Sequence, residues 1–220
     1  MKKNNDRIIV LHGLGLSPFW LWPLSVSLRR AGYTVQNLGY PSREKNIADL
    51  AREHLLPVAI NEAAQTERLH FVGHSLGGLL IRSLAADCGF LPTGRVVMLG
   101  TPNQGSEVAD YLKRFSLYRR YFGPAGQELG TATSDKPKSL PPVPFDLGVM
   151  AGTNHWLHFP TGVFMSRPND GIVSLESTRV AGMKDHISYS IDHSLMVLDP
   201  RVMYQTRHFL ENGCFNRKEA

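Results

Sequence analysis

The stretch FVGHSLGG at residues 71–78 constrains the fold of this chain more than any other. An apolar, β-type run leads into it and a helical run at 79–87 follows, so the pattern predicts a strand, a very tight turn and a helix. Gly73 and Gly77 flank Ser75 in the spacing G-x-S-x-G, which lets strand and helix pass closely while the central residue is strained. We therefore predict that the turn exposes the Ser75 hydroxyl at a helix N-terminus, which favours developing negative charge. A glycine-rich turn around an ordinary serine is the alternative.

The remaining strand-like and helix-like runs alternate along the chain. The β-type runs lie at 7–11, 33–38, 95–99, 145–151 and 187–191, and the helical runs at 18–30, 47–64, 108–122 and 198–210. This alternation predicts an α/β fold with a mostly parallel sheet covered by helices on both faces. We expect Ser17 to cap the first helix, Pro57 to kink or split the second, and residues 123–144 to form a long loop. The chain 1–220 then forms a single domain, with a lid or cap excursion at about 108–144.

The composition is that of an ordinary soluble globular protein, with 42% hydrophobic and 20% charged residues among 220. Cys88 and Cys214 lack metal-ligand spacing and are expected to be free thiols. No RNA- or DNA-binding signature accompanies the net charge of +5, which we interpret as mostly solvated surface that permits weak attraction to anionic lipid. The apolar run at 8–13 is too short for a signal peptide and no stretch is long enough to span a bilayer, so we expect a cytoplasmic protein.

A serine nucleophile needs a base within hydrogen-bond reach, and nine histidines compete for this role. His193 follows the last predicted strand, in a loop before the final helix. This places it at the carboxyl end of the sheet, where the chemistry of α/β folds collects. His186 begins the same strand and should lie at the opposite edge, and His155 and His158 belong to an irregular stretch; all three stay as alternatives. His74 adjoins Ser75, but the turn should point it elsewhere.

The base needs an acid that fixes its tautomer. Asp170 lies in an Asn-Asp-Gly turn between the penultimate strand and His193. It therefore completes the chain order Ser, Asp, His that is associated with this type of serine turn. Asp146 and Asp185 lie at the starts of strands, at the wrong edge, and the side chain of Asp192 should point away from its neighbour. The alternative for Asp170 is a purely turn-forming role.

With these residues in place, the chain resembles a small member of the α/β-hydrolase superfamily, in its lipase and esterase branch, close to the lipase-like and GPI-inositol-deacylase-like groups. The matching segments follow the family's order almost from end to end: LHGLG at 11–15, VGHSLGG at 72–78, LGTPNQGS at 99–106, NDGIV at 169–173 and DHS at 192–194. The resemblance implies that Leu14 and Leu76 supply the backbone N–H groups of an oxyanion hole. One departure concerns the acid, which in small lipases usually follows the preceding strand closely, whereas a longer stretch separates Gly152 from Asp170 here.

The resemblance implies two-step acyl transfer. Ser75 would attack a carboxylic ester while His193 takes its proton, and Asp170 would orient the imidazole. This chemistry requires no metal or organic cofactor, and its partner is a small-molecule acyl ester, for which we expect medium-chain acyl groups. An acyltransferase or a thioesterase with the same triad, or a non-catalytic binding protein on this fold, are the alternative functions. The oligomeric state is left open.

Residues near the oxyanion loop and the serine are candidates for substrate binding. Phe19 and Trp20 follow the loop and are expected either to line an apolar acyl pocket or to join the core. His12 ends the strand that carries the loop and His74 adjoins the serine, so we expect both beside the substrate. The segment 111–122 has an aromatic face flanked by basic residues, which suits a lid, a membrane-surface contact or a helix packed on the sheet.

Overall fold

The computed structural model describes residues 5–217; the first four residues, which include two of the basic residues at the start of the chain, and the last three lie outside the described residues. A six-stranded sheet forms its centre, in the order β2-β1-β3-β4-β5-β6 with every neighbouring pair parallel. The strands are β1 Arg7–Leu11, β2 Thr34–Leu38, β3 Leu69–His74, β4 Val96–Leu99, β5 Leu147–Gly152 and β6 Asp185–Tyr189. The predicted α/β fold with a mostly parallel sheet is confirmed.

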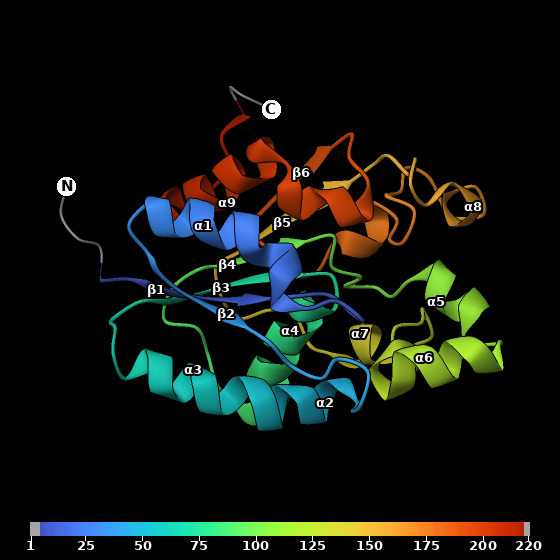
Figure 1. Ribbon diagram of the computed structural model, residues 1–220, viewed down its shortest axis with the longest axis horizontal. Helices are drawn as coiled ribbons and strands as arrows, with labels where there is room; N and C mark the ends of the chain where they lie inside the picture. The colour runs from blue at the N-terminus through green and yellow to red at the C-terminus, as the bar shows by residue number, and fades with distance from the viewer. Residues whose placement is uncertain (1–4, 218–220) are drawn as a thin grey trace.

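Helices cover both faces of this sheet, as Figure 1 shows. On one face lie α1 (Trp22–Arg30) and α9 (Pro200–Asn212); on the other lie α2 (Ile47–Leu50), α3 (Leu56–Ala63) and α4 (Leu76–Cys88). Two apolar clusters result, one on each face of the sheet. Because the central strands β3 and β4 are buried along their whole length, the sheet is a rigid platform whose carboxyl edge carries the loops.

The first two helical segments are more irregular than the sequence predicts. A 3-10 turn, η1 (Pro18–Leu21), precedes α1. Ser17 is the N-cap of this turn and Pro18 its first residue, as predicted, but the Ser17 side chain makes no capping hydrogen bond. The predicted helix at 47–64 is split as expected. A π-helical turn, η2 (Ala51–Leu55), separates α2 from α3 just before Pro57, which cannot donate a backbone hydrogen bond.

The prediction of one helix at 108–122 followed by a long loop is wrong. The structure has α5 (Glu107–Leu112), α6 (Ser116–Gln127) and a short α7 (Lys136–Ser139). Gly123, with φ of +64°, kinks α6. These helices lie at one end of the molecule, beyond the carboxyl edge of the sheet (Figure 1). That this segment acts as a lid stays a prediction, as does the single domain over 1–220.

The remaining elements surround the same edge. They are the short helix α8 (Phe159–Gly162) and the 3-10 turns η3 (Glu176–Thr178) and η4 (His193–Leu198). The last strand begins at Asp185, two residues before the predicted start, and the final helix begins at Pro200. Within residues 5–217, no helix combines length with the apolar character that a membrane span requires.

The close crossing of β3 and α4 yields a testable prediction. A Cβ atom at Gly73 would lie 2.5 Å from the Gly78 nitrogen and 2.6 Å from the Gly77 carbonyl carbon, and neither backbone atom can rotate away. Gly73→Ala should therefore lower the free energy of unfolding by about 3 kcal/mol. Urea unfolding measures the loss.

Gly32→Ala is the matched control. A Cβ there meets nothing within 4 Å, although φ of +99° alone should cost about 1 kcal/mol. Equal losses in the two variants would show that close packing is not the reason for the glycine at 73.

Candidate active site

Ser75 lies on the turn between β3 and α4 in a strained conformation. Its φ of 53° and ψ of −121° make it the only non-glycine residue with positive φ among residues 5–217. Its N–H donates to the Leu99 carbonyl at 2.8 Å, and its carbonyl accepts from the Gly78 N–H at 3.1 Å. These bonds and the flanking glycines hold the strained turn, as the G-x-S-x-G spacing predicts.

His193 and Asp170 meet at the carboxyl edge of the sheet. His193 Nδ1 lies 2.7 Å from Asp170 Oδ2, and the His193 N–H donates to the Asp170 carbonyl at 3.1 Å. The other carboxylate oxygen, Oδ1, accepts backbone N–H groups of Ile172 at 3.0 Å and Val173 at 2.7 Å. Because the buried carboxylate accepts from Nδ1–H, the imidazole is held with Nε2 as its basic nitrogen.

The chain between β5 and Asp170 is long, but it folds back so that Asp170 lies against the end of β5. A Cβ atom on Gly152, the last residue of β5, would lie 2.7 Å from the Asp170 Cβ. A Cβ on Gly100, which follows β4, would lie 3.0 Å from His193 Nδ1. The His193–Asp170 pair therefore fills the space that these two glycines leave open above β4 and β5.

Ser75 and His193 line one cavity of about 350 Å³. Most of its other lining residues are apolar and come from the loop after β1 and from α5 and α6, including Leu14, Val108, Leu112 and Phe122. Ser75 is 8% exposed and His193 is 5% exposed, so both residues are buried in the wall of this cavity.

The resemblance assigns an oxyanion hole to the backbone N–H groups of Leu14 and Leu76. Leu14 lies in the turn after β1 and lines the cavity, and Leu76 is the first residue of α4, directly after Ser75. Among the hydrogen bonds of the described residues, neither N–H donates to a protein acceptor. Both donors are thus available to a ligand oxygen near Ser75.

Comparison with known proteins identifies the family. Residues 8–206 match the model of the alpha/beta hydrolase family. The chain belongs to this family. Within the family's fold, the strained serine turn, the buried His–Asp pair and the loop after β1 occupy one edge of the sheet.

Several solved structures share the fold at low sequence identity. The mature Bacillus licheniformis lipase BlEst2 is 18% identical, with a TM-score of 0.70 over 97% of this chain and 93% of that one. The Staphylococcus hyicus lipase is 15% identical, with a TM-score of 0.64 over 96% of this chain and 95% of the lipase. The Legionella pneumophila phospholipase PlaB is 17% identical, with a TM-score of 0.60 over 79% of this chain but only 45% of its own.

Two further histidines of this hydrolase-family chain lie close to the serine, but burial keeps them neutral. Burial, reinforced by the nearby His193, lowers the pKa of His74 to about 3, and burial also lowers the pKa of His12. His74 lines the cavity, and its Nε2–H donates to the His193 carbonyl at 3.1 Å. His12 stacks on Tyr40 at a centroid distance of 4.2 Å and is not among the cavity residues. His74 therefore fixes the loop that carries His193, and His12, whose Nδ1 lies 2.8 Å from the Gly13 carbonyl oxygen, supports the loop after β1.

The lowered pKa of His74 predicts a pH-dependent stability. An unfolded histidine titrates near 6.5, whereas the folded His74 stays neutral down to about pH 3. Its contribution is thus complete above pH 6.5 and is lost as the pH falls toward 3, by about 1.4 kcal/mol per pH unit. His186, whose pKa burial lowers to about 4, adds to the loss in the same direction. Urea unfolding between pH 7 and 4 should therefore show a decline that is shallower in His74→Gln.

His208→Gln is the control for this measurement, because that ring lies near the surface, where it hydrogen-bonds the Cys214 carbonyl. A decline of unchanged slope in His74→Gln would contradict the assignment of the pH dependence to His74.

Of the alternative bases, His158 lines the cavity with Ser75, whereas His186 and His155 do not. His186 lies in β6 with Nε2 2.9 Å from the Thr178 hydroxyl, and it is not among the cavity residues. His155 is also absent from them. Asp146 and Asp185 bind Lys184 and Arg217 at other parts of the surface.

The Asp192 carboxylate organises the α8 loop and also caps η4 by accepting the Ser194 N–H at 3.2 Å. Its Oδ1 lies 2.8 Å from His158 Nδ1, and its Oδ2 accepts the Leu157 N–H at 3.0 Å. His158 lines the cavity, so a second His–Asp pair lies beside the first. Sequence reasoning missed this pair. The stretch around His158 is irregular, and no pattern in it indicates that His158 packs beside Asp192 at the end of β6.

The aromatic residues that follow the oxyanion loop do not line the cavity. Phe19 is 81% exposed and Trp20 is 42% exposed, and neither is among the cavity residues. Neither expectation for them, the acyl pocket or the core, is therefore supported. Instead, Tyr118 and Phe122 of α6 supply the aromatic wall, with ring centroids 4.7 Å apart.

Proposed function

We propose that the protein hydrolyses carboxylic esters with Ser75 as nucleophile, His193 as general base and Asp170 as the residue that orients the imidazole. One observation carries the proposal: the strained Ser75 shares an apolar cavity with His193, whose Nδ1 lies 2.7 Å from the buried Asp170 carboxylate. A serine hydroxyl is protonated at neutral pH and needs such a base. Membership of the alpha/beta hydrolase family is consistent with this chemistry.

The proposed reaction has two acyl-transfer steps. His193 Nε2 accepts the Ser75 proton as Oγ attacks the ester carbonyl, and the N–H groups of Leu14 and Leu76 stabilise the oxyanion. The imidazolium, stabilised by Asp170, then protonates the leaving alcohol, which breaks the ester C–O bond and leaves Ser75 acylated. A water molecule activated by His193 releases the carboxylic acid and restores the serine. The reaction needs no metal or organic cofactor.

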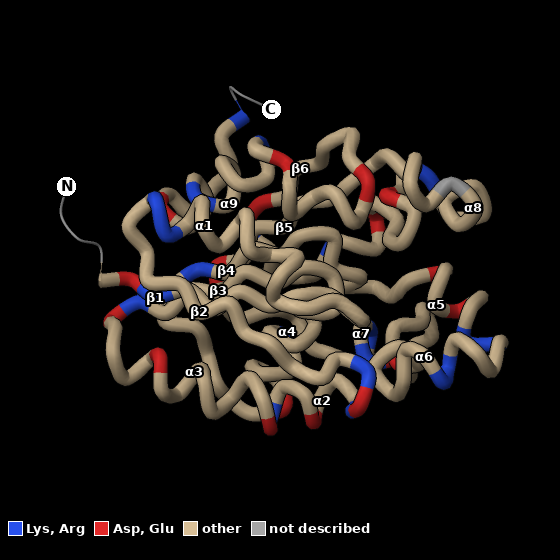
Figure 2. The backbone as a smooth tube through the Cα atoms, in the orientation of Figure 1, with Lys and Arg blue, Asp and Glu red and all other residues tan. Residues whose placement is uncertain are grey.

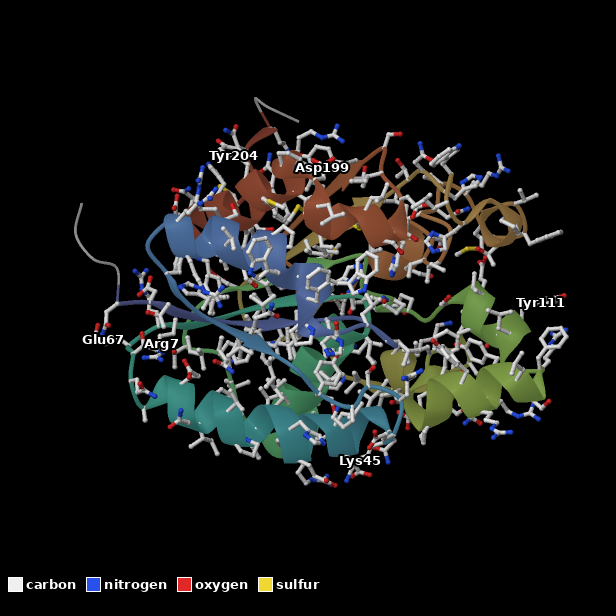
Figure 3. The ribbon with its side chains drawn as sticks, in the orientation of Figure 1. Arg7, Lys45, Glu67, Tyr111, Asp199 and Tyr204 are labelled. Carbon is white, nitrogen blue, oxygen red and sulfur yellow. The ribbon has the colours of Figure 1, made fainter. Side chains whose placement is uncertain are left out.

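The cavity supports an apolar acyl group as the substrate's reactive half. Its walls include Val108, Leu112, Phe122, Leu129 and Ile172. We propose a medium-chain acyl ester as the substrate. Outside the cavity, α5 and α6 expose further apolar side chains, of which Leu117 is 77% and Tyr111 is 58% exposed, and Tyr111 projects away from the body of the molecule (Figure 3). These side chains support the proposal of a weak contact with a lipid surface.

A panel of p-nitrophenyl esters of increasing acyl length tests this function. We expect saturable hydrolysis with the highest kcat/KM at medium chain length, and labelling of Ser75 by a fluorophosphonate probe. Adding competing alcohol or thiol acceptors and analysing the products separates hydrolysis from acyl transfer. If no ester is hydrolysed and the probe fails to label Ser75, the proposal is wrong and a non-catalytic binding role becomes the better interpretation.

A further inference from the structure

A second pocket, of about 520 Å³, opens directly beside the candidate active-site cavity. Gly15, Leu16 and Tyr121 line both, so the two spaces adjoin along the loop after β1. The second pocket is bounded on its other side by the loop at 40–44, which precedes α2, and by α6. A molecule held at Ser75 therefore lies next to this second pocket.

Arginine side chains distinguish this pocket from the apolar cavity. Arg43 comes from the loop and Arg120 from α6, and among the described residues neither forms an ion pair with a carboxylate. Glu44 is the one acidic residue in the lining. Figure 2 shows basic residues on this loop and on α6 at the same end of the molecule. The pocket thus offers two guanidinium groups against one carboxylate.

Further contacts preorganise the pocket. The Arg43 guanidinium lies 4.8 Å from the centroid of the Tyr121 ring, which holds it over the boundary between the two spaces. The backbone of Gly123 packs so closely on the Arg43 carbonyl that a Cβ there would collide with it. Ser42 is buried and its Oγ accepts the Gly15 N–H at 3.0 Å, so its own hydroxyl proton can be donated. Lys45, in contrast, pairs with Glu53 and lies at the outer edge of the loop (Figure 3).

We propose that this pocket binds an anionic group, of the phosphate type, on the alcohol half of the ester, so that the substrate is an anionic acyl amphiphile. The inference rests on the proposed ester hydrolysis. The acyl chain lies in the apolar cavity with its carbonyl at Ser75, and the alcohol extends along Gly15 and Leu16. Arg43 and Arg120 then hold the anion, because a guanidinium donates charge-assisted hydrogen bonds to phosphate oxygens.

Two esters that differ only in the phosphate test the proposal. They are 1-decanoylglycerol 3-phosphate and 1-decanoylglycerol, assayed as monomers by the release of decanoate. We expect the wild-type kcat/KM to be about tenfold or more higher for the phosphate ester. Arg43→Gln and Arg120→Gln should each lower this preference about tenfold through KM, while the rate with the neutral ester changes by less than about twofold.

Arg114→Gln is the matched control, since it removes the same charge near α6 from a residue outside the pocket. It should keep the preference for the phosphate ester. A wild type without preference, or an equal loss in Arg114→Gln, would overturn the proposal, because the effect would then be absent or would come from general surface charge.

A binding measurement separates this proposal from the ester chemistry. Calorimetry of Ser75→Ala with the ether analogue 1-decylglycerol 3-phosphate should show binding that Arg43→Gln and Arg120→Gln weaken. If no ester is hydrolysed but this binding is found, the catalytic proposal fails and the anion pocket stands. If the analogue does not bind, or if inorganic phosphate alone binds as tightly, the assignment to an amphiphilic substrate is wrong.

Discussion

Ser75→Ala should lower kcat for ester hydrolysis by roughly ten-thousandfold or more, because the variant has no hydroxyl to form the acyl-enzyme. The remaining rate would come from the oxyanion N–H groups and from binding. The unfolding free energy should not fall, since the Ser75 hydroxyl makes no hydrogen bond among the described residues that alanine would remove, and its structural bonds are those of the backbone. Initial rates on the preferred p-nitrophenyl ester and urea unfolding measure the two effects.

Ser27→Ala is the matched control, because Ser27 lies on α1 and does not line the cavity. It should retain the wild-type rate. A Ser75→Ala variant whose turnover equals that of Ser27→Ala would remove Ser75 from the mechanism.

Asp170→Asn is expected to lower kcat by roughly a thousandfold to ten-thousandfold. The amide cannot carry the charge that stabilises the imidazolium, and its NH₂ group favours the wrong tautomer of His193 when it faces Nδ1. KM should change little, because the carboxylate is buried behind the imidazole and is not among the cavity residues. Steady-state kinetics across pH distinguish this effect from a loss of substrate binding.

Asp192→Asn tests the other carboxylate that adjoins His193. Asp192 binds His158 and the backbone of the α8 loop, so its variant should lose stability and change kcat by no more than about tenfold. If Asp192→Asn lost as much turnover as Asp170→Asn, the assignment of the acid from the His193 contact would be wrong.

The sequence predicts the centre of the site because that information is local or follows from topology. The glycines around Ser75 specify the turn directly, and a parallel sheet brings the ends of β3, β5 and β6 to one edge. Asp170 and His193 follow β5 and β6, so alternation of strands and helices was enough to place them together. The hydrogen bond between Asp170 and His193 is consistent with this placement.

The surroundings of the site depend on contacts that no local pattern encodes. Phe19 and Trp20 have the composition of a pocket wall, yet η1 turns them toward the surface. The sequence also does not predict the break between α5 and α6, because the spacing of the aromatic residues in 111–122 fits a single helix. In the structure Tyr118 lines the cavity, whereas Tyr111 is exposed. Arg43 and Arg120 are far apart in the chain and meet only because α6 packs on the loop before α2.

The hydrogen bond from His74 to the His193 carbonyl spans 119 positions of the chain and joins the serine turn to the loop of the base. If the C-terminal third of the chain opened, this bond would break and the His193 imidazole would move away from Ser75. The catalytic rate would then be lost even while the central strands remain paired. Enzyme assays during graded urea treatment would consequently report the docking of η4 and α9 earlier than spectroscopic probes of the whole fold.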